Sequence, residues 1–151
     1  MKIFLSFIFC CCGIGVFGQN QNPNYDEALA QKLGADDYGM KAYVLGIYTS
    51  GSNVSEDKEA RSAAFRGHLN NIERMVKAGK LIVAGPFGKN NYDYRGLLIF
   101  NVETLEEAQE LLAEDPAVQA KYLDFQLVPW YGSAALPEYL EASDKVWKKQ
   151  P

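Results

Sequence analysis

The fold of this chain is decided by the stretch Ala78-Gly79-Lys80-Leu81-Ile82-Val83-Ala84-Gly85-Pro86-Phe87. Gly79 is typical of the end of a helix, because glycine readily adopts the left-handed conformation found there. The apolar run 81–84 predicts a short buried strand, and Gly85-Pro86 predicts a sharp turn. The stretch therefore marks the passage from a helix to a buried strand.

The segments on either side complete a regular order of elements. A helix is predicted from Glu56 to Ala78, with Ser55 as its N-cap, and a second helix from Thr104 to about Glu114. The predicted strands are residues 41–49, 81–84, 96–102 and 122–130. The order is βαββαβ, which closes a four-stranded antiparallel sheet with both helices on one face. We therefore predict an α+β, ferredoxin-like domain.

The strands also bear on assembly. Residues 41–49 are apolar at both alternating sets of positions, and residues 97–100 are apolar throughout, as expected of strands buried on both faces. Two helices cover only one face of a sheet, so a second copy of the domain is the economical cover for the other face. We expect a homodimer of the α/β-barrel type. In the alternative, the polar leader 19–40 and the tail 132–151 fold back over the open face.

The first eighteen residues have the pattern of a secretory signal. Lys2 precedes a nearly continuous apolar run from Ile3 to Phe17, and Gly18 lies where a signal peptidase would cleave. A transmembrane anchor needs about 20 apolar residues, and this stretch is shorter. A lipoprotein signal is a further alternative, because residues 10–12 are all cysteines. We expect cleavage after residue 18 and a secreted or periplasmic protein with no membrane attachment.

Composition excludes several kinds of partner. The net charge is −4 with no dense basic cluster, which argues against nucleic acid. All three cysteines lie within the predicted signal, so the mature chain has no thiol or disulfide. With a single histidine and no visible carboxylate cluster around it, we expect no metal site and no cofactor. The length fits one domain, predicted at residues 41–131.

His68 is the only histidine and the first candidate for proton transfer near neutral pH. It lies at the border of an apolar stripe formed by Phe65, Leu69, Ile72 and Val76. Taken alone, it is better explained as an ordinary boundary histidine whose ring packs against its neighbours. Asp115 before Pro116 has a plain explanation too, as a helix N-cap.

The predicted topology brings the two residues together. The two helices lie side by side on one face, so the end of the second can deliver Asp115 to His68. A carboxylate bonded to one ring nitrogen would fix the tautomer and leave the other nitrogen for a substrate proton.

The turn after the second strand is the candidate wall of a cleft. Gly85 permits close approach of a ligand, and Pro86 fixes the turn without a backbone donor. Phe87 and Tyr48 would form an apolar rim around His68 and Asp115. In the alternative, Phe87 belongs to the core and the turn has no role in binding.

Taken as a set, these motifs resemble the YciI-like (YCII-related) domain family over Lys41 to Trp130. The residues that carry the resemblance are His68-Leu69, Ala78-Gly79-Lys80-Leu81, Ala84-Gly85-Pro86-Phe87, Gly96, Asp115-Pro116 and Pro129-Trp130. The resemblance implies a dimeric ferredoxin-like domain with a His-Asp pair at His68 and Asp115. Members often have an arginine three residues before the histidine, where this chain has Phe65, so Arg61 and Arg66 are the nearby substitutes for binding an anion.

The resemblance also narrows the function. A relative is a dehydrochlorinase acting on a chlorinated hydroxymuconate, and related folds include muconolactone isomerases. The first hypothesis is a small cofactor-free enzyme of the lyase or isomerase type, in which the His-Asp pair transfers a proton on a small carbonyl, enol or muconate-like compound. The second is a non-catalytic module that binds a small ligand or a partner, since this fold hosts both.

Overall fold

The computed structural model describes residues 22–149. The predicted signal peptide lies outside the described residues. The elements in chain order are α1 (Glu27–Leu33), β1 (Met40–Ser50), α2 (Lys58–Lys77), β2 (Leu81–Pro86), β3 (Tyr94–Phe100), α3 (Leu105–Ala113), α4 (Pro116–Gln119), β4 (Leu123–Ser133), the 3-10 helix η1 (Leu136–Glu138) and α5 (Tyr139–Val146). Within residues 22–149, no helix combines the length and apolar composition needed to cross a membrane.

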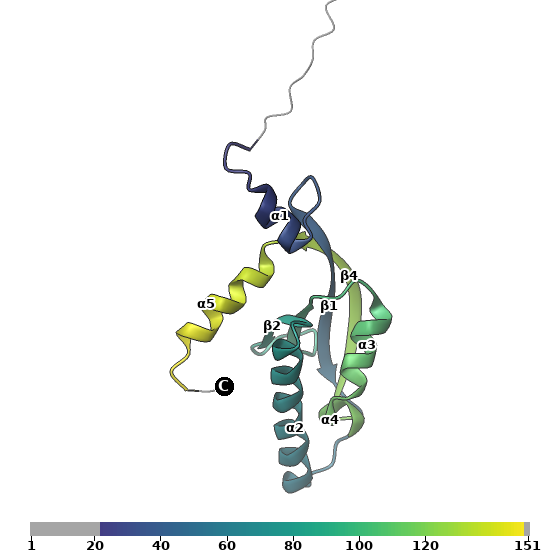
Figure 1. Cartoon of the computed structure of the whole chain (residues 1–151). Helices are drawn as coiled ribbons and strands as arrows, with labels where there is room; N and C mark the ends of the chain where they lie inside the picture. The colour runs from purple at the N-terminus through teal and green to yellow at the C-terminus, as the bar shows by residue number, and fades with distance from the viewer. Residues whose placement is uncertain (1–21, 150–151) are drawn as a thin grey trace, which may run out of the picture.

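The predicted ferredoxin-like arrangement is confirmed. The sheet has the strand order β2-β3-β1-β4, and every neighbouring pair is antiparallel. Helices α2, α3 and α4 lie on one face of this sheet (Figure 1). The core between the two layers is formed by side chains of the central strands, such as Val44, Leu98 and Phe100, together with Met75 of α2 and Leu112 of α3.

Helix α2 begins two residues later than the sequence predicts. The N-cap is Asp57 and not Ser55, because the Asp57 carboxylate accepts hydrogen bonds from the N–H groups of Glu59 and Ala60. Ser55 instead accepts a hydrogen bond from the N–H of Asp57. The helix ends before Gly79, which has a positive φ of 69° as its position predicts.

The buried face of α2 also differs from the prediction. Its buried members are Ala64, Asn71 and Met75, and His68 lies on the same line at helical spacing. The predicted apolar stripe is turned to one side, and the side chain of Leu69 is 50% exposed. The side chain of His68 is 12% exposed and lies at the edge of this buried line, beside a cavity. Phe65, Ile72 and Val76 of the apolar stripe are partly buried against the core.

The second helical segment is divided in two. Thr104 caps α3 through the N–H of Glu107, and Asp115 caps α4 through the N–H of Ala117, with Pro116 at the first helical position. Both caps agree with the sequence. Because α4 is a separate turn that packs against α2, its N-terminus is set beside the middle of that helix.

The opposite face of the sheet is not covered by these helices. It carries the half-buried or exposed apolar side chains Leu45, Ile47, Val83, Leu97, Ile99, Val128 and Trp130. Helix α5 stands apart from the sheet (Figure 1), and none of its residues is buried. The C-terminal segment touches the leader instead, through an ion pair between Lys32 and Glu138 of 3.3 Å.

Candidate functional site

The centre of the candidate site is a hydrogen bond between His68 and Asp115. His68 projects from the middle of α2, and Asp115 is the N-cap of α4. The His68 Nδ1 to Asp115 Oδ2 distance is 2.6 Å. The predicted contact is therefore present, across 47 residues of sequence.

Asp115 is the most enclosed charged group among the described residues, with an exposed fraction of 0%. Its Oδ2 accepts from His68 and from the Tyr48 hydroxyl, and its Oδ1 accepts from the N–H of Ala117. Burial alone would raise the pKa of Asp115, but the hydrogen bonds and the charge of His68 outweigh burial and hold the pKa below its ordinary value of 3.8. Asp115 is consequently ionised at neutral pH.

Tyr48 is the third member of this cluster. Its hydroxyl donates to Asp115 Oδ2 over 2.8 Å, and its ring meets the His68 ring edge-on at a centroid distance of 5.2 Å. Burial, the charge of Asp115 and the hydrogen bond together raise the pKa of Tyr48 above its ordinary value of 10.0. Tyr48 therefore stays protonated, and its hydroxyl is engaged with Asp115.

The protonation of Asp115 determines the role of each His68 nitrogen. An ionised carboxylate only accepts hydrogen bonds, so Nδ1 of His68 must donate its proton to Asp115. The tautomer is inferred from this network. In the neutral ring, Nε2 then has a lone pair, and no hydrogen bond to it is present within residues 22–149. The arrangement leaves Nε2 as a proton acceptor.

A glycine beside the histidine makes the contact possible. A Cβ added at Gly67 would lie 2.6 Å from Cγ of Pro116, which is far inside van der Waals contact. The absence of a side chain lets the first residue of α4 lie directly on α2. Gly67 thus brings Asp115 within hydrogen-bonding reach of His68.

A cavity of about 340 Å³ lies beside this cluster, between α2 and the sheet. Its wall contains side chains or backbone of Tyr48, Phe65, His68, Leu69, Ile72, Ala84, Gly85, Pro86, Arg95, Gly96, Leu97, Leu98 and Leu123. The lining is mostly apolar, and its polar side chains are those of His68, Tyr48 and Arg95. Such a combination is typical of sites for small organic ligands.

Small residues form part of the strand side of the cavity. Helix α2 contributes the large side chains of Phe65, Leu69 and Ile72, whereas β2 and β3 contribute small residues together with larger ones. These strand residues are Ala84, Gly85, Pro86, Arg95, Gly96, Leu97 and Leu98. Ala84 and Gly96 lie on the helix side of the sheet and have little or no side chain to fill the space opposite α2.

The predicted site residues fall into two groups. Tyr48, Gly85 and Pro86 line the cavity beside His68, but Phe87 and Arg61 are not among its lining residues. Pro86 lies opposite Gly96, and the alternation of the strand turns the next side chain, Phe87, to the other face of the sheet.

Phe87 and Arg61 have other neighbours. The Phe87 ring lies 5.8 Å from that of Tyr94 and its side chain is 41% exposed, so Phe87 is not a core residue either. Arg61 lies over the rings of Phe65 and Tyr122, at 5.4 and 5.5 Å. Both residues are adjacent to the site without facing the cavity.

Sequence reasoning missed two residues. Arg95 lines the cavity because of a strand irregularity that no local pattern indicates. Gly67 could have been identified from the sequence. A glycine inside a helix costs stability relative to alanine, so its presence next to His68 indicates that another element packs closely against the helix there.

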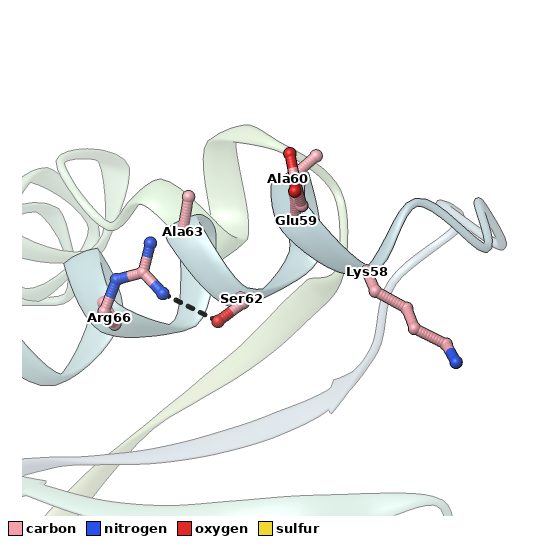
Figure 2. A pocket seen from close by; sticks show the side chains of 6 residues that line it. All are labelled: Lys58, Glu59, Ala60, Ser62, Ala63 and Arg66. Atoms are coloured by element: carbon pink, nitrogen blue, oxygen red, sulfur yellow. Dashed lines mark hydrogen bonds between the residues drawn. The ribbon is translucent and has the colours of Figure 1, made fainter.

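A second hollow lies on the outer side of α2 and is unconnected with His68. Figure 2 shows that its six lining residues all come from the first turns of this helix, with Arg66 bonded to Ser62 Oγ at 2.7 Å. A hollow formed by one helix face cannot enclose a ligand. Nor do residues 22–149 include a group of three or more His, Cys, Asp or Glu side chains placed to hold a metal ion.

Fold and site together define a ferredoxin-like α+β domain with a His-Asp pair beside an apolar cavity. The chain belongs to the YCII-related domain family, whose model matches residues 40–131. This match places the chain in the family that the sequence motifs resemble. A search of curated proteins finds no match.

Nine chains of solved structures match. One is the 5-chloro-2-hydroxyhydroquinone dehydrochlorinase of Burkholderia phenoliruptrix AC1100 in complex with 2,5-dihydroxybenzoquinone. It is 23% identical, with a TM-score of 0.42, and the match covers 58% of this chain and 92% of that chain. Its named substrate is a chlorinated hydroxyhydroquinone, and not the chlorinated hydroxymuconate that we expected of a dehydrochlorinase relative.

Proposed function

We propose that this protein is a small enzyme that transfers a proton on a small organic molecule, with His68 as the acid-base group and Asp115 as its positioning residue. The observation that carries the proposal is the 2.6 Å hydrogen bond that holds His68 in the wall of a cavity of about 340 Å³. A volume of that size suits a single small organic molecule.

The chemistry follows from which nitrogen of His68 carries the proton and which can accept one. Nε2 of His68 takes a proton from a carbon next to a carbonyl, or from an enol or phenol hydroxyl, and the ring becomes an imidazolium. The Asp115 carboxylate stabilises that cation through the Nδ1 hydrogen bond. Return of the proton to another atom completes an isomerisation, and departure of a leaving group completes an elimination.

Solvent exchange tests this proposal without knowledge of the natural reaction. Small keto acids and hydroxyquinones are incubated with the protein in D2O, and loss of the exchangeable C–H signal is followed by proton NMR. General acid-base catalysis contributes about 10²- to 10⁴-fold to rate, so we expect His68→Gln to lose at least about a hundredfold in exchange rate. Asp115→Asn should also slow exchange, because the ring is no longer held in one orientation.

Arg66→Gln is the matched control, since Arg66 lies on α2 but faces the outer hollow (Figure 2). It should exchange the active compound at the wild-type rate. Equal rates in wild type and His68→Gln for every compound that exchanges would contradict the proposal.

A second candidate function is binding without catalysis. It is favoured by the mostly apolar cavity lining and by the use of Asp115 as the N-cap of α4, a structural role that needs no chemistry. In that case a compound should bind in the cavity, its affinity should change in His68→Gln, and no exchange should be detected.

We propose further that the protein is a homodimer in which two copies pack their open sheet faces together. The support is the set of apolar side chains on that face, which includes Val128 at 47% exposure. Continuous apolar patches of this kind mark association surfaces. The tail is a poor cover for this face, because α5 stands apart from the sheet (Figure 1).

We also propose export from the cytoplasm, by way of the signal at residues 1–18. Support comes from Lys2 and the apolar run that follows it. Mass spectrometry of the protein recovered from its native host should give an N-terminus at residue 19, and an intact N-terminus would contradict export by cleavage.

A further inference from the structure

The cavity wall contains one permanently charged side chain, Arg95. We propose that Arg95 binds the anionic group of a small organic acid, so that the molecule handled by His68 carries a carboxylate. This inference rests on the proposed function in placing the ligand in the same cavity. It adds the chemical class of the ligand and a residue that selects for it.

A β-bulge is what directs Arg95 to the cavity. Tyr48 pairs with Gly96 and Thr49 pairs with Tyr94, so Arg95 has no partner of its own in β1. In a regular strand Arg95 would point to the face opposite Gly96, whereas a bulge changes the direction of the extra residue. Arg95 accordingly lines the cavity, with a side chain that is 57% exposed.

Two neighbours hold the guanidinium in place. Arg95 Nε donates to Ser50 Oγ over 2.7 Å, and Nη2 is 3.0 Å from Oδ1 of Asp93. Ser50 Oγ in turn donates to the same Asp93 oxygen over 2.8 Å. The side chain is thus oriented before any ligand arrives, which reduces the entropy lost on binding.

The guanidinium keeps donors for a ligand. An arginine has five N–H donors, and Ser50 and Asp93 engage only Nε and Nη2. Within residues 22–149, Nη1 has no hydrogen bond. Nη1 and Nη2 can therefore each donate a hydrogen bond to one oxygen of a planar carboxylate, which gives two parallel bonds.

The rest of the wall favours a carboxylate over a phosphate. No second permanently charged cation lines the described cavity, and Asp93 already offsets part of the Arg95 charge. A phosphate dianion in this setting would be poorly neutralised. A singly charged acid with an apolar body matches one guanidinium and the apolar side chains of Phe65 and Ile72.

Benzoate and benzamide form a matched pair of probes, because they share shape and ring but only benzoate is charged. Titration of wild type with each at pH 8, followed by isothermal calorimetry or NMR, gives the ratio of their dissociation constants. Hydrogen bonds to a charged group correspond to about tenfold or more in affinity, so benzoate should bind at least about tenfold more tightly. In Arg95→Gln the ratio should fall to about one, with benzamide affinity unchanged.

Arg66→Gln is the control for loss of a positive charge from the surface and should keep the wild-type ratio. Arg95→Lys keeps the charge without the fork and should give an intermediate ratio. Thermal unfolding of Arg95→Gln distinguishes a structural role of Arg95 from a role in binding. A purely structural role would lower the stability of the variant without changing its preference for benzoate. A wild type that does not prefer benzoate, including one that binds neither probe, or an unchanged ratio in Arg95→Gln, would overturn the inference.

The result is separable from the proposed function. His68→Gln should lose proton exchange and keep its preference for benzoate, whereas Arg95→Gln should lose the preference. If the preference is present and no variant affects exchange, the proton-transfer proposal fails and the assignment of Arg95 stands.

Discussion

Asp115 uses one carboxylate both as the cap of α4 and as the partner of His68 in the proposed acid-base pair. One oxygen caps α4 and the other accepts from His68 and Tyr48. The two interpretations that the sequence left open for this residue are therefore not exclusive. Because both oxygens are occupied by protein donors, Asp115 is placed to orient His68 and not to contact a ligand.

The lowered pKa of Asp115 makes stability depend on pH in a definite direction. Its pKa is near 3.8 in the unfolded chain and lower in the native state. Between these two pKa values the unfolded chain therefore binds a proton that the native protein does not bind. The contribution is therefore fully present above about pH 5 and is lost as pH falls through 3.8 toward the native pKa. Urea unfolding of wild type and Asp115→Asn, from pH 7 down to pH 2.5, measures it.

We expect wild type to exceed Asp115→Asn by about 2 kcal/mol at pH 7, because a hydrogen bond to a charged group contributes about 1.5 to 3 kcal/mol. The difference should shrink below pH 4. Asparagine remains a good N-cap, so the cap itself is retained. Asp36 and Asp93 also have lowered pKa values but are present in both proteins, and their effects cancel. A pH-independent difference would contradict this account of Asp115.

At the scale of elements, the crossing of α2 and α4 depends on Gly67. Alanine in an exposed helix interior is more stabilising than glycine by about 1 kcal/mol. Here the added methyl group would lie 2.6 Å from a rigid proline ring. Overpacking of this kind costs about 1 to 3 kcal/mol, so we expect Gly67→Ala to lower the free energy of unfolding by about 1 kcal/mol.

Asn70→Ala is the control for Gly67→Ala, because Asn70 is exposed on the same helix and alanine there should be neutral or slightly stabilising. Chemical denaturation of both variants gives the comparison. A Gly67→Ala protein as stable as Asn70→Ala would mean that α4 does not rest on Gly67 as described.

A comparison of the elements with the sequence shows which features sequence patterns can predict. The βαββαβ order, the cap at Thr104 and the contact of His68 with Asp115 follow from periodicity, capping residues and topology. The rotation of α2 could not be predicted, because Leu69 of its apolar stripe is half exposed beside the cavity while the polar Asn71 is buried. The position of Arg95 could not be predicted either, because the bulge depends on pairing between strands distant in sequence.

At the scale of the whole molecule, the open sheet face leads to the dimer proposal. We expect the mature protein to sediment as a dimer at micromolar concentration. Val128→Asp places a charge on the proposed interface and should shift the protein to the monomer, because burying an unpaired charge is costly. A stable interface of this kind buries about 800 Å² on each partner.

Val54→Asp is the matched control for the dimer, since Val54 is an exposed valine in the loop before α2, away from that face. It adds the same charge and should sediment as wild type does. A wild-type monomer at micromolar concentration, or equal sedimentation of the two variants, would contradict the proposed interface.

The central claim is that Asp115 holds His68 with Nδ1 protonated and Nε2 available. His68 is the only histidine, so a tag-free protein gives one set of imidazole nitrogen signals in a long-range proton–nitrogen NMR spectrum. At pH 9, where an ordinary imidazole is neutral, we expect a protonated-type shift at Nδ1 and an unprotonated-type shift at Nε2. In Asp115→Asn this preference should weaken. A proton on Nε2 in wild type, or a tautomer unaffected by Asp115→Asn, would contradict the claim.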